Sequence, residues 1–201
     1  VRHAPARYRA VVTVLAYTGL RLSEALGLRW RDVDLVDSEL HVRGQLAKLR
    51  RGEAPRVVPP KTRAALRTVP LFPAVERALV EHLAVEQAAG RGREQDFVFC
   101  SRTGRPFEQR NVATRGVEAA ARAAGLGHVT PQDLRRSACS LMARRGVDPV
   151  AAARITGHSL AVWVSHYARD YGRAQRREAV KRLVSSGFGV VASQCEATDG
   201  A

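Results

Sequence analysis

The sequence predicts a mainly α-helical α+β domain with a small three-stranded antiparallel sheet. Three observations support this fold class: helical periodicity near the N-terminus, a strand pattern between residues 39 and 71, and capped helix starts in the second half. With 201 residues, 45% of them hydrophobic, the chain has enough apolar material for one well-cored domain and is short for two. We therefore expect one domain over residues 1–184 and a tail over residues 185–201.

The first two predicted helices lie on either side of Gly19. Residues 5–18 carry apolar side chains at the i, i+3, i+4 and i+7 spacing of an amphipathic helix, and Gly19 is placed to end it in the left-handed conformation. A second, short helix is expected to be capped by Ser23 and to end before Trp30. A turn is expected at residues 32–34.

The sheet is predicted between residues 39 and 71. Three strand-like runs, separated by charged or proline-containing connectors, form it: 40–42, 57–58 and 66–71. Pro59 and Pro60 are incompatible with a central strand. This places Lys61 at the hairpin tip between the last two strands.

Helices return after Pro73. The expected elements are a helix from Pro73, a loop at 90–93, a short strand at 96–100, a turn at 103–106, a helix at 111–124 and a basic helix at about 172–184. Two further helices begin with a capping side chain before a first-turn proline, Thr130 with Pro131 and Asp148 with Pro149. Each of these two is expected to end at a glycine.

The charge of the chain indicates a polyanionic partner. The net charge is +14 and the isoelectric point is about 11.1, far beyond what solubility requires, so nucleic acid is the leading candidate. The three cysteines lack metal-ligand spacing, which favours a reducing compartment. No apolar run approaches the roughly 20 residues of a membrane span, and no signal peptide is evident. These features predict a cytoplasmic protein.

Four polar clusters are candidates for chemistry: Arg21 with Glu24, Lys61, Gln132 with Arg135, and His158 with Tyr167. Each has an ordinary structural alternative. A lysine at a sheet edge discourages strand pairing, and a histidine after a helix-ending glycine can cap the helix carbonyls. Lysine is rare here, at only three positions, and its ammonium can release a proton, which a guanidinium cannot do at neutral pH.

The order of these clusters resembles that of the tyrosine recombinase, or phage integrase, family. The matching segments are Thr-Gly-Leu-Arg-Leu-Ser-Glu at 18–24, Pro-Lys-Thr at 60–62, Thr-Pro-Gln-Asp-Leu-Arg-Arg-Ser at 130–137 and Gly-His-Ser at 157–159, with nine residues from His158 to Tyr167. The resemblance covers residues 5–184, and its first and last motifs are highly specific. It implies a helical catalytic domain with a three-stranded sheet.

The resemblance also implies a reaction and a set of catalytic residues. A site-specific DNA recombinase of this kind cleaves a strand by forming a 3′-phosphotyrosine and releasing a 5′-hydroxyl. The matched positions are Tyr167 as nucleophile, Arg21 and Arg135 as phosphate ligands, Lys61 as the hairpin lysine, His158 as the third-box histidine and Glu24 as the acidic residue beside the first arginine. Neither a metal nor another cofactor is implied.

Physical chemistry is consistent with these roles. A phosphodiester gains negative charge as it becomes pentacoordinate, so fixed cations stabilise the transition state. A phenol with a pKa near ~10 is a poor nucleophile at neutral pH, and we expect the same cations to lower the cost of forming the phenolate. Lys61 can donate a proton to the departing 5′-oxygen.

Gln132 departs from the family pattern, which commonly has histidine at this position. A glutamine amide can donate a hydrogen bond to phosphate but exchanges no proton near neutral pH, so we expect an altered rate more than a lost activity. Tyr171 lacks the nine-residue spacing from His158, and it is not expected to be the nucleophile.

The expected partner is double-stranded DNA, on which the resemblance implies a homotetramer assembled from monomers. The location implied is bacterial or phage cytoplasm, near the nucleoid. Because the family carries an N-terminal helical DNA-binding domain that this chain lacks, we expect the chain to be part of a longer protein. The tail is expected to be disordered or to dock on a neighbouring subunit.

Three alternatives stay open from the sequence. The helices from residue 131 to 167 can form the helix-turn-helix of a non-catalytic DNA-binding regulator. A type IB topoisomerase-like enzyme shares the same chemistry but relaxes supercoils. A relative inactivated at Gln132 would bind recombination sites without cutting them.

Overall fold

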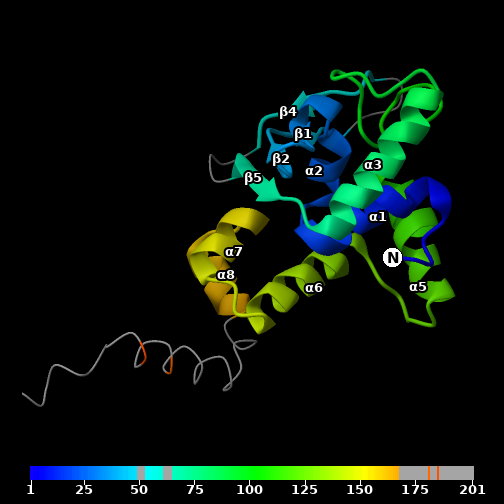
Figure 1. Cartoon of the computed structure of the whole chain (residues 1–201). Coiled ribbons are helices and arrows are strands. Elements are labelled where there is room, and N and C mark those ends of the chain that lie inside the picture. Colours follow the sequence, from blue (N-terminus) through cyan, green and yellow to red (C-terminus); the bar gives the residue numbers. More distant parts are fainter. Residues whose placement is uncertain (49–52, 61–64, 168–180, 182–184, 186–201) are drawn as a thin grey trace, which may run out of the picture.

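The computed structural model describes residues 1–48, 53–60, 65–167, 181 and 185. Helices dominate, and two small antiparallel sheets lie together on one side of the molecule (Figure 1). The predicted mainly helical α+β class is confirmed. Lys61 and most of the predicted helix at 172–184 lie outside the described residues.

Helices α1 and α2 meet at a sharp turn. Helix α1 (Ala6–Thr18) ends at Gly19, whose φ of 67° is the left-handed conformation that glycine adopts without strain. Helix α2 (Leu22–Gly27) begins before Ser23, so the predicted cap is wrong. The Glu24 carboxylate in its first turn accepts the backbone N–H of Arg21 at 2.9 Å, while the Ser23 hydroxyl donates to Gln45.

The larger sheet contains strands β1 (Val33–Asp34), β2 (Glu39–Val42) and β5 (Arg67–Pro70) in the order β1-β2-β5. The predicted turn at 32–34 is therefore partly strand, after the short 3₁₀ helix η1 (Trp30–Asp32). The turn itself lies just beyond β1, where the Asp34 carboxylate accepts the N–H groups of Val36 and Asp37.

The predicted strand at 57–58 does not join this sheet. Strand β4 (Val57–Val58) pairs with β3 (Gln45–Leu46) in a second, two-stranded sheet. A two-residue run contains too little alternation to determine its partner from sequence. Gly44 permits this pairing, because a Cβ atom at Gly44 would lie 2.6 Å from the Val57 side chain.

The segment between residues 73 and 124 follows the prediction except at two places. Helix α3 (Pro73–Ala88) begins with its first-turn proline. The predicted strand at 96–100 forms only isolated bridges, at Phe97 and Cys100, because the partner of Cys100 is Pro106, which has no N–H to extend a ladder. The predicted helix at 111–124 is a continuous helix of three parts: α4 (Gln109–Asn111), the π-helical stretch η3 (Val112–Glu118) and α5 (Ala119–Ala123).

The last three described helices have the predicted caps. Helix α6 (Pro131–Arg144) is capped by the Thr130 hydroxyl, and α7 (Pro149–Thr156) by the Asp148 carboxylate, which accepts two backbone N–H groups at 2.9 and 3.0 Å. Gly157 ends α7 with a φ of 67°. Helix α8 (Leu160–Tyr167) then folds back on α6 and α7 (Figure 1).

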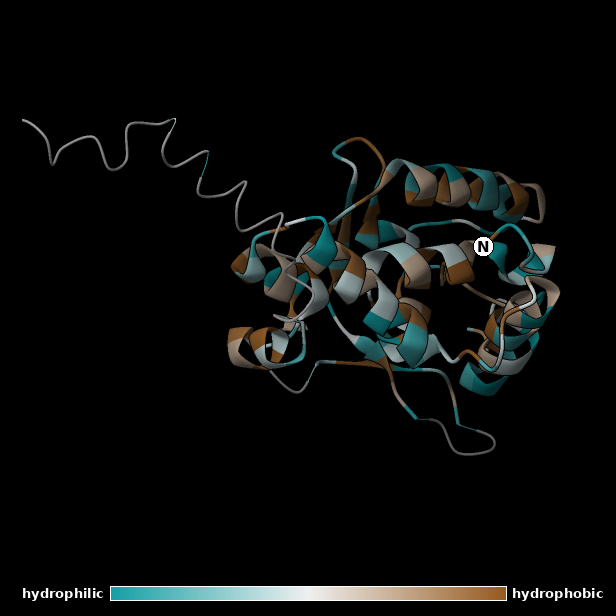
Figure 2. Ribbon diagram, turned by 90° about the horizontal axis from the view of Figure 1, so that it is seen from below, coloured by the Kyte–Doolittle hydropathy of each residue, from teal (hydrophilic) through white to brown (hydrophobic). Residues whose placement is uncertain are grey.

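Hydrophobic residues form two cores. The larger core lies around α1, which Figure 2 shows among helices that carry both hydrophilic and hydrophobic residues. The second core joins α6, α7 and α8 through these residues: Cys139, Met142, Ala143, Ala152, Ala153, Trp163 and Tyr167. No helix in the described part of the chain combines the length and the apolar character that crossing a membrane requires.

Candidate active site between α2, α6 and α7

Four predicted site residues come from four separate segments: three of these meet around the turn at Gly19, and the fourth, Tyr167, lies beside His158. Arg21 precedes α2, Arg135 lies in the second turn of α6, His158 follows α7 and Tyr167 ends α8. The turn is tightly packed, since a Cβ at Gly19 would lie 3.3 Å from the Thr156 methyl group. The local glycine conformation therefore determines how closely these segments approach one another.

Glu24 is the buried anion of the site. Its side chain is 2% exposed and binds Nη1 of Arg21 at 2.8 Å, as expected from the sequence, whereas Arg21 itself is 43% exposed. Burial alone would raise the pKa of Glu24, but hydrogen bonds and charge from Arg67, with further bonds from Arg21, lower the pKa below its usual value. Glu24 is therefore ionised at neutral pH and holds the Arg21 guanidinium at the surface.

Arg67 is a site residue that the sequence analysis missed. Its side chain is 4% exposed, and Nη2 binds Glu24 Oε2 at 2.8 Å. One arginine at the start of a strand carries no signal among so many arginines. Glu24 is buried between Arg21 and Arg67 only in the folded chain, so the sequence does not indicate that Arg67 is its partner.

Arg135 is the most deeply buried cation of the site, with 2% of its surface exposed. It donates Nη1–H to the carbonyl oxygen of Gly19 and Nη2–H to Nε2 of His158, the latter at 2.9 Å. Burial and the neighbouring charge of Arg21 lower the pKa of Arg135 to about 10, so it stays protonated at neutral pH. Among the described residues, no carboxylate forms an ion pair with Arg135. Burying such a cation is costly, and a bound anion would offset this cost.

The partners of His158 determine where its proton lies. Arginine has only donors, so Nε2 of His158 accepts from Arg135 and is unprotonated. Nδ1 lies 2.9 Å from the Thr156 hydroxyl, which donates to the carbonyl of Ala152 and therefore accepts the Nδ1 proton. Burial and the surrounding cations, Arg135 first among them, lower the pKa of His158 to about 4. The ring is thus neutral at physiological pH.

Tyr167 is packed into the second core. It is 9% exposed, with ring centroids 5.5 Å from Trp163 and 6.1 Å from His158. Burial and the adjacent Cys139 thiol raise the pKa of Tyr167 to about 12, although the Arg135 charge acts in the opposite direction. In this arrangement, burial and Cys139 raise the pKa of Tyr167 more than the cations lower it, so the expected net decrease of the pKa is not observed.

Gln132 lies on the open side of the site. It is exposed, and with Arg21, Gln109 and Arg110 it lines a cavity of about 380 Å³. Arg135 lies one turn further along α6 and deeper in the protein. The guanidinium groups of Arg21 and Arg110 and the two glutamine amides can therefore donate hydrogen bonds to an anion in this cavity.

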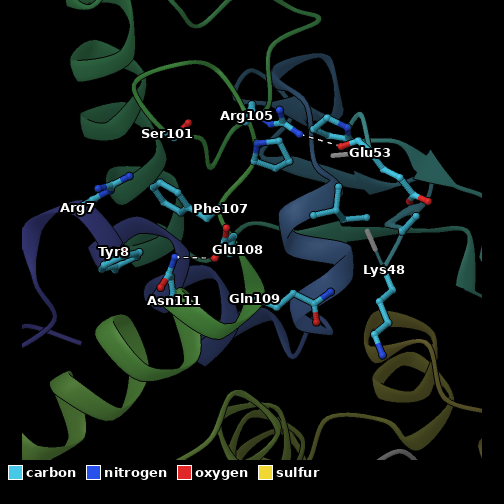
Figure 3. Close-up of a pocket in the computed structure, with 14 residues that line it drawn as sticks. Arg7, Tyr8, Lys48, Glu53, Ser101, Arg105, Phe107, Glu108, Gln109 and Asn111 are labelled. Atoms are coloured by element: carbon cyan, nitrogen blue, oxygen red, sulfur yellow. Dashed lines mark hydrogen bonds between the residues drawn. The ribbon is translucent and has the colours of Figure 1, made fainter. Parts of the chain in front are cut away.

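A larger cavity, of about 760 Å³, continues from this region toward the β3-β4 hairpin. It shares Gln109 with the first cavity, and Figure 3 shows Arg7, Lys48 and Arg105 around it. Arg105 donates to the carbonyl of Glu53 at 2.9 Å, which ties the loop before α4 to the hairpin. Basic side chains therefore line both cavities, and Glu53 and Glu108 add two carboxylates to the lining of the larger one.

Metal-ligating side chains do not cluster here. Among residues 1–48, 53–60 and 65–167, no group of three or more histidine, cysteine, aspartate or glutamate side chains has the arrangement of a metal site. Cys100 and Cys139 are both buried and unbridged.

Known proteins resemble this chain in sequence and in fold. The chain matches the model of the phage integrase family over residues 2–173. It is 31% identical over 153 residues to tyrosine recombinase XerD of Neisseria meningitidis serogroup B, and 33% identical over 153 residues to tyrosine recombinase XerC of Xanthomonas campestris pv. campestris. Both alignments cover 76% of this chain, but 47% and 41% of the relatives, so the chain spans about half the length of the curated relatives it matches.

The structural matches agree on the fold. A Tn1549 transposon integrase in complex with transposon right end DNA superposes with a TM-score of 0.71 at 23% identity, covering 89% of this chain and 59% of that one. The XerA recombinase superposes with a TM-score of 0.63 at 25% identity, covering 88% of this chain and 56% of that one. The resemblance predicted from the sequence is confirmed, and the chain belongs to the phage integrase family.

Proposed function

We propose that the chain carries the catalytic site of a site-specific DNA recombinase, which cleaves and rejoins DNA strands through a 3′-phosphotyrosine at Tyr167. The observation that carries this proposal is the meeting of Arg21, Arg135 and His158 beside the helix that ends in Tyr167. The names of the matched relatives, which are recombinases and integrases, support it.

The phosphate is bound by the cations around Gly19. Arg21 presents an exposed guanidinium that Glu24 holds in place, and Arg135 lies behind it as a second permanent charge. Planar guanidinium groups donate two parallel hydrogen bonds to phosphate oxygens. These donors stabilise the additional negative charge of the pentacoordinate transition state. Gln132, which lines the same cavity as Arg21, adds a neutral donor.

Cleavage forms one bond and breaks one. The Tyr167 oxygen attacks the phosphorus, the bond to the 5′-oxygen breaks, and the phenolic proton moves to a base. Gln132 cannot accept this proton. His158 can accept it only after Nε2 is released from Arg135, because in the present arrangement Nε2 accepts the Arg135 N–H and Nδ1 carries the ring proton. In this proposal Lys61, which lies outside the described residues, donates a proton to the departing 5′-oxygen. A hydroxyl of a partner strand then reverses the step.

The buried Tyr167 requires a movement before attack. In its present position the phenol packs against Trp163 and Cys139, which favours the protonated form. DNA binding would move α8 out of the second core and bring the phenol to the phosphate. Many enzymes change in this way from a resting to an active conformation, because substrate binding completes their catalytic site.

The proposal is tested by trapping the covalent intermediate. A pool of nicked duplexes with randomised sequence around the nick is incubated with the 201-residue chain, and SDS-stable adducts are collected and sequenced. We expect adducts with the wild type and with Tyr171→Phe, but none with Tyr167→Phe. If the wild type gives no adduct, the chain is a DNA-binding protein without strand-transfer activity, either a regulator or a relative inactivated at Gln132. Adducts that relax supercoiled DNA without exchanging partner strands indicate the topoisomerase-like alternative.

The remaining assignments belong to the same proposal. The partner is double-stranded DNA, and residues 1–184 form the catalytic domain. Apart from Ser185, the expected tail at residues 185–201 lies outside the described residues. The protein is a monomer alone and a homotetramer on DNA, in the cytoplasm near the nucleoid. Light scattering with and without the DNA recovered from the adducts measures both oligomeric states.

A further inference from the structure

Arg67 connects three segments of the site without facing the cavity. Its side chain is 4% exposed, and all three guanidinium nitrogens donate to protein acceptors. Nη1 and Nη2 bind the two carboxylate oxygens of Glu24 at 3.2 and 2.8 Å, and Nε binds the carbonyl of Ile155 at 2.8 Å. One guanidinium therefore links β5, α2 and the last turn of α7.

Gly157 packs directly on this guanidinium. A Cβ atom at Gly157 would lie 2.8 Å from Nη1 and 2.9 Å from Cζ of Arg67. Such a distance is shorter than real Cβ contacts, so a side chain at this position would displace the guanidinium or the helix end. The conformation of the residue before His158 and the position of Arg67 thus depend on each other.

The contacts of Arg67 lead to Arg21, a proposed phosphate ligand, and to His158, the proposed proton acceptor. On one side, Glu24 holds Nη1 of Arg21 at 2.8 Å. On the other side, the Ile155 carbonyl and the Gly157 backbone determine where the chain leaves α7, and His158 is the next residue. We propose that Arg67 is a positioning residue that fixes Arg21 and His158 relative to each other. This inference rests on the proposed function.

The geometry requires an arginine. The bidentate contact with Glu24 and the separate bond to Ile155 use the planar fork of the guanidinium. A lysine ammonium at this position can neutralise Glu24 but cannot make the same three contacts in one plane. The Arg67→Lys variant therefore keeps the positive charge at this position but loses the geometry of the three hydrogen bonds.

The test compares Arg67→Met and Arg67→Lys with a matched control. Arg91 forms a similar ion pair with a buried glutamate, since its Nε lies 2.6 Å from Oε2 of Glu86, whose side chain is 7% exposed. Because Arg91 lies away from the site, Arg91→Met reports the general effect of breaking such a pair. Melting temperatures measure the loss of stability in each variant.

Adduct formation under single-turnover conditions is the kinetic readout. We expect Arg67→Met to form the Tyr167 adduct about 100-fold more slowly than the wild type, the size of effect expected when reacting groups are misplaced by about 1 Å. Its DNA affinity should stay within about threefold, because Arg67 does not face the substrate. Arg67→Lys should regain melting temperature but not rate, and Arg91→Met should keep the wild-type rate.

The NMR titration of His158 is a second readout that needs no activity. In the wild type its pKa is lowered to about 4. Arg67→Met should raise the pKa of His158 toward 6.5, because the helix end is released and one cation is lost, while Arg135, Arg21 and His166 still face the ring. Arg91→Met should leave it unchanged.

The two readouts separate the inference from the proposed function. An unchanged His158 titration in Arg67→Met overturns the inference. So does a rate that falls equally in Arg67→Met and Arg91→Met. A wild type that forms no adduct overturns the recombinase proposal, and the titration alone then decides the role of Arg67.

Discussion

At the scale of single residues, the site is a cluster of cations around one buried carboxylate. Among the described residues, Glu24 binds Arg21 and Arg67, whereas Arg135 donates to a backbone carbonyl and a neutral imidazole. The described part of the cluster thus carries more positive than negative charge. In the proposed function, a phosphate diester supplies the balancing negative charge, so that binding and catalysis use the same residues.

The neutral state of His158 makes the stability of the fold depend on pH. Its pKa is about 4 in the folded chain and near 6.5 when the chain is unfolded, so between these values the unfolded state binds the extra proton. The free energy of unfolding should therefore fall as the pH decreases from 6.5 toward 4. Urea unfolding of the wild type and His158→Gln measures this, and the variant should lose less stability over that range. Parallel curves for the two proteins would contradict the assigned neutral ring.

The glutamine at position 132 should limit the rate of strand cleavage. Replacing it by histidine places a group that titrates near neutral pH in the cavity beside Arg21. We expect Gln132→His to form the adduct about 10-fold faster or more at pH 7, a modest share of what acid–base catalysis supplies. The control is Gln109→His, which changes another residue that lines the same cavity. Equal rates for Gln132→His and the wild type would show that proton transfer does not involve this position.

At the scale of helices and strands, capping residues predicted more than strand patterns did. The helices that follow Thr130 and Asp148 were predictable because a cap and a first-turn proline act locally. The pairing of Val57 and Val58 with β3, and the short β1, depend on contacts between segments distant in sequence. The π-helical stretch before α5 has no local signal that we identify.

The same distinction applies to the site. Arg21 precedes α2 and Glu24 lies in its first turn, so their contact follows from the local geometry of a helix N-terminus. The contact of Arg135 with Gly19 spans 116 residues, and that of Arg67 with Glu24 spans 43. The burial of Tyr167 against Cys139 also results from packing between helices, and no spacing in the sequence indicates it.

The glycine that ends α7 should be much less tolerant of substitution than a glycine of similar conformation elsewhere. Gly157 and Gly125 have φ angles of +67° and +70°. A Cβ atom added to Gly157 would lie within 4 Å of Arg67, whereas one added to Gly125 would have no atom within 4 Å. Alanine at either position should cost about 1–2 kcal/mol for the left-handed conformation. Gly157→Ala should lose about 1–3 kcal/mol more, because the methyl group overlaps Arg67. Urea unfolding measures both, and equal losses would contradict the described packing of Arg67.

At the scale of the whole molecule, the charge of +14 is arranged for a large polyanion. The two cavities that share Gln109 carry Arg7, Lys48, Arg105 and Arg110 beside Arg21. If this surface binds the phosphates of DNA as proposed, counterions are released and the affinity decreases with salt. Sequence composition alone predicted this property, because it does not depend on the fold.

The salt dependence of DNA binding gives a quantitative prediction. The logarithm of the association constant should fall linearly with the logarithm of salt concentration, and Arg21→Ala should reduce the slope by about 1 because one phosphate contact is lost. Fluorescence anisotropy with a labelled duplex measures the slope, and Arg91→Ala serves as the control that should keep it. Binding that does not weaken with salt would contradict an electrostatic interface.

The central claim, that Tyr167 attacks the DNA phosphate, is tested most directly by mass spectrometry of the trapped adduct. After nuclease and protease digestion, the remaining nucleotide should be attached to the peptide that contains Tyr167, through a bond that resists SDS. A nucleotide on the peptide that contains Tyr171 but not Tyr167, or on any other residue, would contradict the account.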